Sequence, residues 1–531
     1  MAQSANNNHV GSENRHHLGG IGDWIRYQAQ VRGDSEAIVY GDTRLSYQDF
    51  DARINRLAMT LSDKSVRKGD RVALLLFNCN AFLETFFACA KLGAIAVPLN
   101  YRLSPEELEF IINDAQASVI VYHTDFHGLL EPVRPRTNIV HGIAVLDPEA
   151  LTEDRCSGDE DYETCLTGVS ATDPQTVVAQ SDPLMMMYTS GTTGKPKGAI
   201  LTHSNPTWTA VNIQMSELGF TQQDSTLTVA PLFHIGGLAI YTLPMLYCGA
   251  RIVLAAKFDP VELLSQLESE RITRFGLLPV MWQALSQVPD FDSYDLSALS
   301  VVLCGGSPCP IPVIEFYQRR GFHFLEGFGM TETTATATIL SSHDAVRKHG
   351  SVGKPLTHVR LRIVDEEDND VVDGEVGELV VRGPSLFYGY WNRPRASEKA
   401  WENGWFHSGD LARKDAEGFY YIVDRKKDML ISGGENVYPT EVERVLIDHP
   451  GISDVAVVGV PDDKWGEVPL AFVVPDPDRE RVTLEAVQRF CDGRLARFKA
   501  PKRLAFLQEL PRNATGKVLK RELRKSFTSV P

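Results

Sequence analysis

The stretch Tyr188-Thr-Ser-Gly-Thr-Thr-Gly-Lys-Pro-Lys-Gly198 decides how the rest of the chain is interpreted. It concentrates four aliphatic hydroxyl side chains, three glycines and two lysines in eleven residues. Glycines let the backbone turn sharply and bring N–H groups close to an anion. Hydroxyls add short donors, and Lys195 or Lys197 supplies a point charge suited to phosphate. Because the apolar residues Leu184–Met187 predict a buried strand just before it, the stretch is typical of a phosphate-binding loop at a strand end.

The spacing excludes the common P-loop. That motif, G-x-x-x-x-G-K-[ST], has four residues between its glycines and a Ser or Thr after the lysine. Here two residues separate Gly191 from Gly194, and Pro196 follows Lys195. From the residues alone, a solvated Gly/Ser/Thr linker remains the alternative interpretation.

Length and composition predict a multidomain globular protein. The 531 residues are too many for one core, and 43% hydrophobic with 23% charged residues is ordinary. The net charge of −16 argues against a nucleic-acid or anionic-membrane partner that is held by bulk electrostatics. A polyanionic substrate would therefore need a local basic site, which the lysine-bearing loop supplies.

The remaining composition predicts a cytoplasmic protein, as a monomer or homodimer. Eight cysteines show neither C-x-x-C pairs nor zinc-ligand spacing, which indicates reduced thiols. Residues 1–20 are polar and are expected to form a disordered tail. No run reaches about 18 apolar residues, so we expect no transmembrane segment. The C-terminal Ser529-Val-Pro531 is not a peroxisomal signal.

Hydrophobic patterning predicts α/β layers followed by a β-rich part. Helix and buried strand alternate from about residue 22, with well-capped helix starts at Ser104-Pro-Glu-Glu107 and Asp259-Pro-Val-Glu262. Shorter β-branched segments from about 350 to 424 predict a β-subdomain. The α/β alternation restarts after Asp424–Asp428, with a helix expected near Thr483–Arg497.

A second motif, Glu326-Gly-Phe-Gly-Met-Thr-Glu332, follows an apolar strand. It fails the dinucleotide fingerprint because Glu332 stands at the third glycine position. Beside a phosphate loop, Phe328 offers a face for a purine, and Glu332 offers a carboxylate for magnesium. A plain turn is the alternative interpretation.

Taken together, the motifs resemble those of the adenylate-forming superfamily, which includes acyl-CoA synthetases, aryl-CoA ligases and luciferases. The resemblance spans about residues 25 to 525 and includes three further motifs in the family's order. These are Trp405-Phe-His-Ser-Gly-Asp-Leu411, Asp424-Arg-Lys-Lys427 and Asn513-Ala-Thr-Gly-Lys517. Ser408 stands where the family usually has Thr.

The resemblance implies a fold and a domain organisation. We expect a large N-terminal domain (21–424) of layered α/β subdomains, with a small β-barrel-like subdomain at about 350–424. A hinge at 425–428, centred on Lys427, would join it to a small mobile α+β domain (429–531). The overall class is α/β.

The resemblance also implies which residues bind the nucleotide. Phe328 would stack on adenine, Thr331 would contact the α-phosphate, Asp410 and Arg425 would bind the ribose, and Glu332 would hold the metal. The complete expected ATP/AMP set is Thr189, Ser190, Gly191, Thr192, Thr193, Gly194, Lys197, Gly306, Ser307, Glu326, Gly327, Phe328, Gly329, Thr331, Asp410, Arg425 and Lys517.

Catalysis and acyl binding are assigned in the same way. Lys517 would stabilise the charge that develops on the α-phosphate, assisted by Thr331, and His234 would gate the acyl site. Outside the family context, Lys517 reads as a surface lysine, His234 as a structural histidine, and Arg425–Lys427 as a solvated charge run. The expected acyl pocket comprises Phe233, Gly236, Gly237, Ile240 and Gly306, and the expected coenzyme A contacts are Lys257, Gly433 and Gly434.

The implied function is an ATP-dependent acyl-CoA synthetase that uses Mg²⁺ and coenzyme A. Gly236 and Ile240 stand where hydroxycinnamate ligases carry hydroxyls, so a medium- or long-chain fatty acid is the favoured substrate and an aryl or hydroxycinnamate acid the alternative. A luciferase-like oxidoreductase, an adenylate-dependent amide synthetase and a non-catalytic nucleotide-binding protein are the rival classes. No G-x-S-x-G elbow supports serine-hydrolase chemistry.

Overall fold

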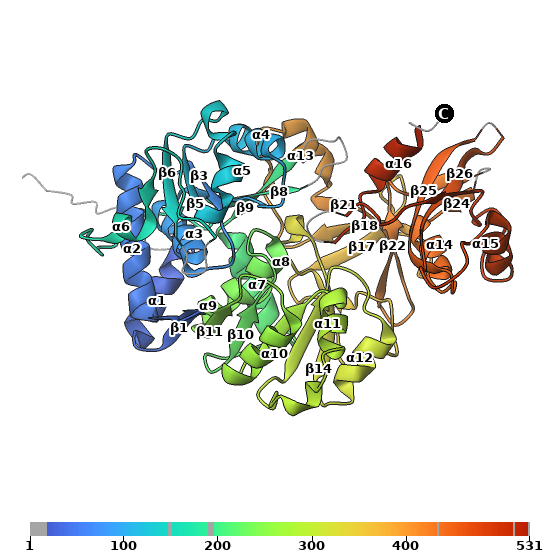
Figure 1. Cartoon of the computed structure of the whole chain (residues 1–531), viewed down its shortest axis with the longest axis horizontal. Coiled ribbons are helices and arrows are strands. Elements are labelled where there is room, and N and C mark those ends of the chain that lie inside the picture. The colour runs from blue at the N-terminus through green and yellow to red at the C-terminus, as the bar shows by residue number, and fades with distance from the viewer. Residues whose placement is uncertain are drawn as a thin grey trace, which may run out of the picture. The chain divides into compact units, whose positions relative to one another are not determined.

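The computed structural model describes residues 19–146, 151–189, 196–432, 435–462, 464–512 and 516–528. It divides into two compact units (Figure 1). The first unit runs to His349 and adds 355–359 and 383–398, and the second comprises 350–354, 360–382 and the chain from Lys399 onward. The expected class, mixed α/β with a large N-terminal and a small C-terminal domain, is confirmed. The predicted hinge, 425–428, falls inside the second unit.

The first sheet of the first unit has a parallel centre. Its strands follow the order β15 (Thr338–Leu340), β14 (His323–Phe328), β13 (Val301–Gly305), β12 (Arg274–Leu277), β10 (Ser225–Thr228), β11 (Arg251–Leu254), β1 (Glu36–Tyr40) and β2 (Thr43–Ser46). One face packs against α10 (Pro260–Ser269), α11 (Pro279–Ser286) and α12 (Ile311–Gln318), which lie beside it in Figure 1. Phe275, Val302 and Phe324 point into this core.

The second sheet of this unit carries the predicted phosphate loop. Its strands follow the order β19 (Gly389–Tyr390), β9 (Lys197–Thr202), β8 (Pro183–Thr189), β4 (Ile95–Pro98), β3 (Arg71–Leu75), β5 (Val119–His123), β6 (His141–Val145) and β7 (Glu160–Asp161). The predicted buried strand is β8, whose Leu184–Met187 are fully enclosed.

Two helices of the first unit, α4 and α10, begin where capping signals predicted. Ser104 accepts a hydrogen bond from the Glu107 backbone in a complete capping box, and Asp259 caps α10. The remaining helices are α1 (Gly22–Arg32), α2 (Tyr47–Asp63), α3 (Asn80–Leu92), α4 (Pro105–Ala115), α5 (His127–Leu130), α6 (Tyr162–Leu166), α7 (Ser204–Gln214), α8 (Ile235–Gly237), the π-helix η4 (Leu238–Thr242), α9 (Leu243–Cys248) and α13 (Pro394–Ala400).

The second unit contains two five-stranded sheets. One consists of β17 (Arg360–Val364), β18 (Gly377–Arg382), β21 (Trp405–Lys414), β20 (Trp401–Glu402) and β22 (Tyr420–Arg425). The other consists of β24 (Glu435–Val437), β23 (Leu430–Ser432), β26 (Gly466–Pro475), β25 (Ile452–Asp462) and β27 (Arg503–Phe506), with α14 (Pro439–Leu446), α15 (Leu484–Cys491) and α16 (Lys520–Thr528).

One predicted helix was wrong in extent. The helix expected near Thr483–Arg497 is α15, which ends at Cys491. Asp492 leaves the helical region with ψ 127°, and Gly493 follows with φ +75°. A glycine with positive φ is a frequent helix terminator, and it overrides the apolar periodicity beyond it.

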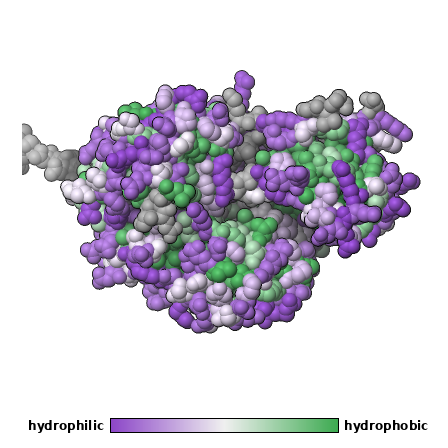
Figure 2. Space-filling view, in the orientation of Figure 1, coloured by the Kyte–Doolittle hydropathy of each residue, from purple (hydrophilic) through white to green (hydrophobic). Residues whose placement is uncertain are grey.

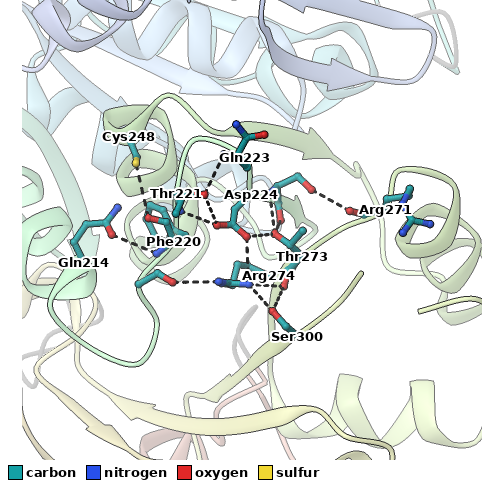
Figure 3. Close-up of polar contacts among 12 residues, drawn as sticks. Gln214, Phe220, Thr221, Gln223, Asp224, Cys248, Arg271, Thr273, Arg274 and Ser300 are labelled. Carbon is teal, nitrogen blue, oxygen red and sulfur yellow. Dashed lines mark hydrogen bonds and ion pairs between the residues drawn. The ribbon is translucent and has the colours of Figure 1, made fainter. Parts of the chain in front are cut away.

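A half-buried polar network fixes the edge of the first sheet where β10, β12 and β13 begin (Figure 3). Arg274 Nη1 lies 2.6 Å from Ser300 Oγ and 3.3 Å from Asp224 Oδ1. The Thr273 hydroxyl donates to the same Asp224 oxygen at 2.7 Å. These residues precede or begin their strands, so the network leaves the opposite, carboxyl edge of the sheet open to loops.

The surface is mostly hydrophilic in the view of Figure 2, with hydrophobic residues in smaller areas. In the ranges that the structure describes, no helix combines the length and the apolar character that crossing a bilayer requires.

The network at Asp224 gives a stability prediction. Asp224→Ala leaves the largely buried Arg274 guanidinium without its carboxylate, and we expect the free energy of unfolding to fall by about 3 kcal/mol in urea denaturation. The control is Asp292→Ala, which removes the ion-pair partner of Arg320. Because the Asp292 side chain is 73% exposed, the free energy of unfolding should fall by less than about 1 kcal/mol. Equal losses in the two variants would contradict the structural role of this network.

Candidate active site

The predicted adenine-binding loops lie side by side at the carboxyl edge of the first sheet. β13 and β14 are parallel, and Gly305 is in register with Gly327. Gly306 and Ser307 therefore leave β13 next to the point where Phe328 leaves β14. Crevices beyond the carboxyl ends of parallel strands are the usual ligand sites of α/β sheets.

The predicted phosphate loop connects the antiparallel pair β8 and β9. Thr189, the last residue of β8, is in register with Lys197, the first residue of β9. Both ends of the loop are therefore held by a ladder. Five of the predicted nucleotide contacts lie outside the described residues: Ser190, Gly191, Thr192, Thr193 and Gly194.

Tyr390 joins this loop to the predicted metal ligand. Its strand β19 pairs with β9, so that Tyr390 is in register with Ala199. The Tyr390 hydroxyl donates to Glu332 Oε1 at 2.9 Å, and Lys197 Nζ lies 5.3 Å from the centre of the Tyr390 ring. Lys197 and Glu332 therefore both lie next to the Tyr390 side chain.

Asp114 anchors the same hairpin from the far side. Its backbone and side chain lie at the end of α4, where Oδ2 accepts from the Tyr188 hydroxyl at 2.8 Å and Oδ1 from Arg393 at 2.6 Å. Its carbonyl accepts from the Trp391 indole at 3.0 Å. Neither Asp114 nor Tyr390 carried a sequence signal, because each acts through partners far away in the chain.

The turn after β14 requires glycine at one position. A Cβ on Gly329 would lie 1.7 Å from the carbonyl oxygen of Ala335, so any side chain would force the turn open. Thr331 and Glu332 follow in a single 3₁₀ turn, Thr331–Thr333. The backbone of Phe387 donates to the Glu332 carbonyl at 2.8 Å and holds this turn in place.

Glu326 is a buried carboxyl group that lacks one partner. Oε2 accepts from the Cys309 backbone at 3.0 Å, whereas Oε1 has no hydrogen-bond partner among the described residues. Burial raises the pKa of Glu326 to about 7. An unsatisfied acceptor next to the adenine loops is suited to a donor on a ligand.

His234 lies in a segment that Asn78 holds in shape. The buried Asn78 amide donates to the carbonyls of Thr228 and Ala230 and accepts from the Leu232 backbone at 2.9 Å. His234 then caps α8 through a 3.4 Å contact from the Gly236 backbone. His234 keeps solvent-accessible surface. The surrounding protein nevertheless desolvates the imidazole, which disfavours its charged form and lowers its pKa.

The small residues after His234 have different roles. A Cβ on Gly237 would lie 2.4 Å from two carbonyl oxygens, so Gly237 is required for packing. A Cβ on Gly236 would sit 3.7 Å from His234 Nδ1 and 3.9 Å from Ile240 Cδ1, which puts these three residues on one face. Gly236 therefore keeps room beside the histidine.

Lys257, one of the predicted coenzyme A contacts, lies by an aromatic cluster near the His234 segment. Its Nζ is 5.8 Å from the Phe77 ring centre. Tyr101 lies 5.0 Å from Phe77 and 5.1 Å from Phe233, measured between ring centres. The other two predicted contacts, Gly433 and Gly434, lie outside the described residues.

The second unit brings its four predicted residues together. Asp410 in β21 is in register with Arg425 in β22, and their side chains form an ion pair. Lys517 is exposed, yet burial of its ammonium and the nearby charge of Arg425 lower its pKa to about 8. The pKa of the neighbouring Lys427 is also lowered, first by burial.

Glu378 of β18 is a central residue that sequence reasoning missed. Its carboxylate accepts from the Gly409 backbone at 3.1 Å and from Lys426 Nζ at 3.0 Å, and it lies 3.4 Å from His407 Nδ1. Lys426 stands beside Arg425, and Gly409 stands beside Asp410. Glu378 therefore braces both strands that carry the ion pair.

The donor set fits magnesium that is shared with phosphate groups. Mg²⁺ usually binds one or two carboxylates and completes its shell with phosphate oxygens and waters. Glu332 supplies such a single carboxylate, oriented by Tyr390, beside the ends of the predicted phosphate loop.

These features define a two-unit α/β protein with the predicted nucleotide-binding loops at its strand ends. The model of the AMP-binding enzyme family matches residues 25–391, and that of the AMP-binding enzyme C-terminal domain matches 441–517. The chain therefore belongs to the AMP-binding enzyme family of the adenylate-forming superfamily.

Known proteins of this family are similar over nearly the whole chain. A feruloyl-CoA synthase from an Amycolatopsis species is 41% identical and covers 96% of this chain and 99% of its own. An indoleacetate–CoA ligase from Aromatoleum aromaticum is 40% identical, with coverages of 95% and 97%. The solved Mycobacterium tuberculosis fatty acyl CoA synthetase is 35% identical, with a TM-score of 0.78 and coverages of 96% and 98%.

The contacts of Glu378 give a binding prediction. We expect Glu378→Ala to weaken AMP binding about tenfold in calorimetric titration, since losing a charge-assisted brace costs about 1.5 kcal/mol. Lys426→Met removes one of the three contacts and should have a smaller effect. Glu402→Ala, an exposed glutamate of β20, serves as the control. A lower melting temperature with unchanged AMP affinity would show that Glu378 supports the fold alone.

Glu326 gives a pH-dependent stability prediction. Its pKa is raised from 4.5 to about 7, so ionisation of the buried carboxyl increasingly destabilises the folded state as pH rises through that interval. Glu326→Gln removes the ionisable group, and its melting temperature relative to the native protein should be higher at pH 8 than at pH 5. Glu315→Gln, at an intermediate position on α12, is the control variant. A Glu326→Gln difference that is constant with pH would contradict the assignment.

Proposed function

We propose that the protein is an AMP-forming acid–thiol ligase that activates a carboxylic acid with ATP and transfers the acyl group to coenzyme A. The observation that carries the proposal is the Lys197–Tyr390–Glu332 arrangement, which places a loop cation beside a carboxylate suited to Mg²⁺. Family membership and the names of the similar proteins, all ligases or synthetases that form CoA thioesters, support it.

In the first half-reaction, a carboxylate oxygen attacks the α-phosphorus, and the bond to pyrophosphate breaks. The hydroxyl loop and Lys197 hold the phosphates, and Glu332 would hold a Mg²⁺ ion, whose charge would offset that of the phosphates. Phe328 and the Gly306 turn enclose the adenine, while Asp410 and Arg425 bind the ribose. Lys517 donates to the oxygens that gain charge, and such a donor typically contributes about 10²–10³ in rate.

In the second half-reaction, the thiol sulfur of coenzyme A attacks the acyl carbon and AMP leaves. His234 lies at the acyl site, and its lowered pKa keeps the ring neutral near pH 7, so it can move aside for a thioester without carrying charge into an apolar lining. Lys257 provides a cation for the phosphates of coenzyme A. We propose residues 425–428 as the hinge about which the C-terminal domain rotates between the two half-reactions. This rotation would remove Lys517 from the reacting groups and open a path for the thiol.

The substrate that we propose is an aryl acid, the alternative of the sequence interpretation. The similar feruloyl-CoA synthase and indoleacetate–CoA ligase both act, by name, on aryl acids. The fatty acid favoured by the small lining residues stays a prediction, which the resemblance to a fatty acyl CoA synthetase keeps as the second candidate.

The two half-reactions can be tested separately. We expect AMP release from a panel of aryl and aliphatic acids, with a thioester formed only when coenzyme A is added. Lys517→Ala should lower adenylation at least about 10²-fold while retaining thioester formation from supplied acyl-AMP. Lys525→Ala, a surface lysine of α16, is the control. Equal loss of both half-reactions in Lys517→Ala would contradict the proposed division of labour.

A further inference from the structure

The face of the first sheet opposite the α10–α12 core carries accessible glycines. Gly276 in β12, Gly305 in β13 and Gly327 in β14 are each partly exposed although their strands are internal. Gly276 is in register with Leu303, and Gly305 with Gly327, so these residues share one face. Strand glycines commonly mark places where a ligand or another backbone approaches closely.

The π-helix η4 covers this face. The Thr242 hydroxyl lies 3.0 Å from that of Thr228 at the end of β10, and it donates to the Gly237 carbonyl at 2.8 Å. Gly236 and Ile240, which stand two and six positions after His234, precede Thr242 in the chain. Short π-helical segments are rare and are frequent at functional sites.

Tyr241 of η4 occupies the position over Gly276. A Cβ on Gly276 would lie 3.1 Å from Tyr241 Cε2 and 3.4 Å from Cδ2, so the ring takes the space that a side chain would need. Tyr241 is 5% exposed. Among the described residues its hydroxyl has no hydrogen-bond partner. Leaving a buried hydroxyl unpaired costs about 1–3 kcal/mol, which a ligand that supplies the partner would recover.

The charges near this hydroxyl nearly cancel. Arg274 and Asp224 both act electrostatically on Tyr241, and they form an ion pair with each other at 3.3 Å. Arg274 Nε likewise has no hydrogen-bond partner within the described ranges. Figure 3 shows the contacts of this pair with Thr273 and Ser300. The surroundings therefore suit a neutral polar group better than a carboxylate or an ammonium.

The depth of this position fits an aryl acid. Gly276 is level with Leu303, three residues before Gly306, and strands rise about 3.3 Å per residue, which gives about 10 Å. This depth is close to the span of an arylpropenoic acid from its carboxylate to a substituent at the far end of the ring. A long alkyl chain would have to pass the Tyr241 ring.

We propose that the acyl group lies along the face that carries Gly276, Gly305 and Gly327, a space we call the acyl lane, and that Tyr241 forms its end. The Tyr241 hydroxyl would bind a neutral hydrogen-bonding substituent, a phenolic hydroxyl, at the distal end of an aryl acid. This inference rests on the proposed function and narrows its substrate class. It makes Tyr241 a specificity-determining residue, seven positions after His234, whereas the sequence interpretation considered only the second and sixth positions.

The test compares three acids that differ at one atom position: cinnamate, 4-methylcinnamate and 4-hydroxycinnamate. For the native enzyme we expect kcat/KM for adenylation to be highest for 4-hydroxycinnamate. Tyr241→Phe removes only the hydroxyl, and we expect the preference for 4-hydroxy over 4-methyl to fall about 3- to 10-fold, as for one buried hydrogen bond. Gly276→Ala should lower the same preference by displacing the ring.

Tyr241→Ala tests the end-stop independently. It should raise the activity on decanoate relative to cinnamate, because the lane lengthens. Tyr317→Phe removes another buried hydroxyl, which donates to the Trp282 carbonyl on the opposite face of the sheet, and it should leave all three cinnamate ratios unchanged.

The outcomes separate this inference from the proposed function. If no acid yields AMP, the proposed function fails. If acids are adenylated but the 4-hydroxy to 4-methyl ratio is the same in the native enzyme and Tyr241→Phe, the inference fails, and the hydroxyl serves a structural water only. Loss of the preference in Tyr241→Phe with retention in Tyr317→Phe supports it.

Discussion

The hydrogen bond from Tyr390 to Glu332 is the contact on which the candidate site depends. It joins three segments that are distant in the chain: the strand pair bearing the hydroxyl loop, the turn after β14, and the short strand β19. The Phe387 backbone already holds the main chain of Glu332 next to β19, and the Tyr390 hydroxyl adds the contact that orients the Glu332 carboxylate. A cation near the Tyr390 ring and a carboxylate at its hydroxyl suit the ligand that we propose, which carries both phosphate and metal.

Local polar contacts compensate for the overall charge of the chain. The net charge of −16 repels polyanions at a distance, yet Lys197 in the first unit, and Arg425 and Lys517 in the second, place positive charge locally at positions predicted to contact the nucleotide. In the second unit, burial removes water from the ammonium groups of Lys427 and Lys517, and neighbouring cations repel them. Both effects lower the pKa values of these two lysines. A bound phosphate would relieve that cost.

The sequence predicted the parts of the structure that local chemistry determines. The capped helices at Ser104 and Asp259, the buried strand before the loop, and the placement of Glu332 in a turn beyond an apolar strand follow from patterns a few residues long. That strand extends further than predicted, since β14 includes Phe328. The end of α15 did not follow from such a pattern, since a single glycine outweighed the periodicity. The roles of Asp114, Glu378, Tyr390 and Tyr241 could not be read from the sequence, because each depends on partners that only the tertiary fold brings near.

The contact between Tyr241 and Gly276 implies that a side chain of η4 sets the length of the proposed acyl lane, whereas the strand beneath it contributes only a glycine. In the site that we propose, exchange of one side chain on that turn would change the length available to the acid without altering any strand, any predicted nucleotide contact or the network at Asp224. Variation in the acid that is accepted can thus arise while the adenylating apparatus stays intact. The substrate specificity of such a protein can change through single substitutions.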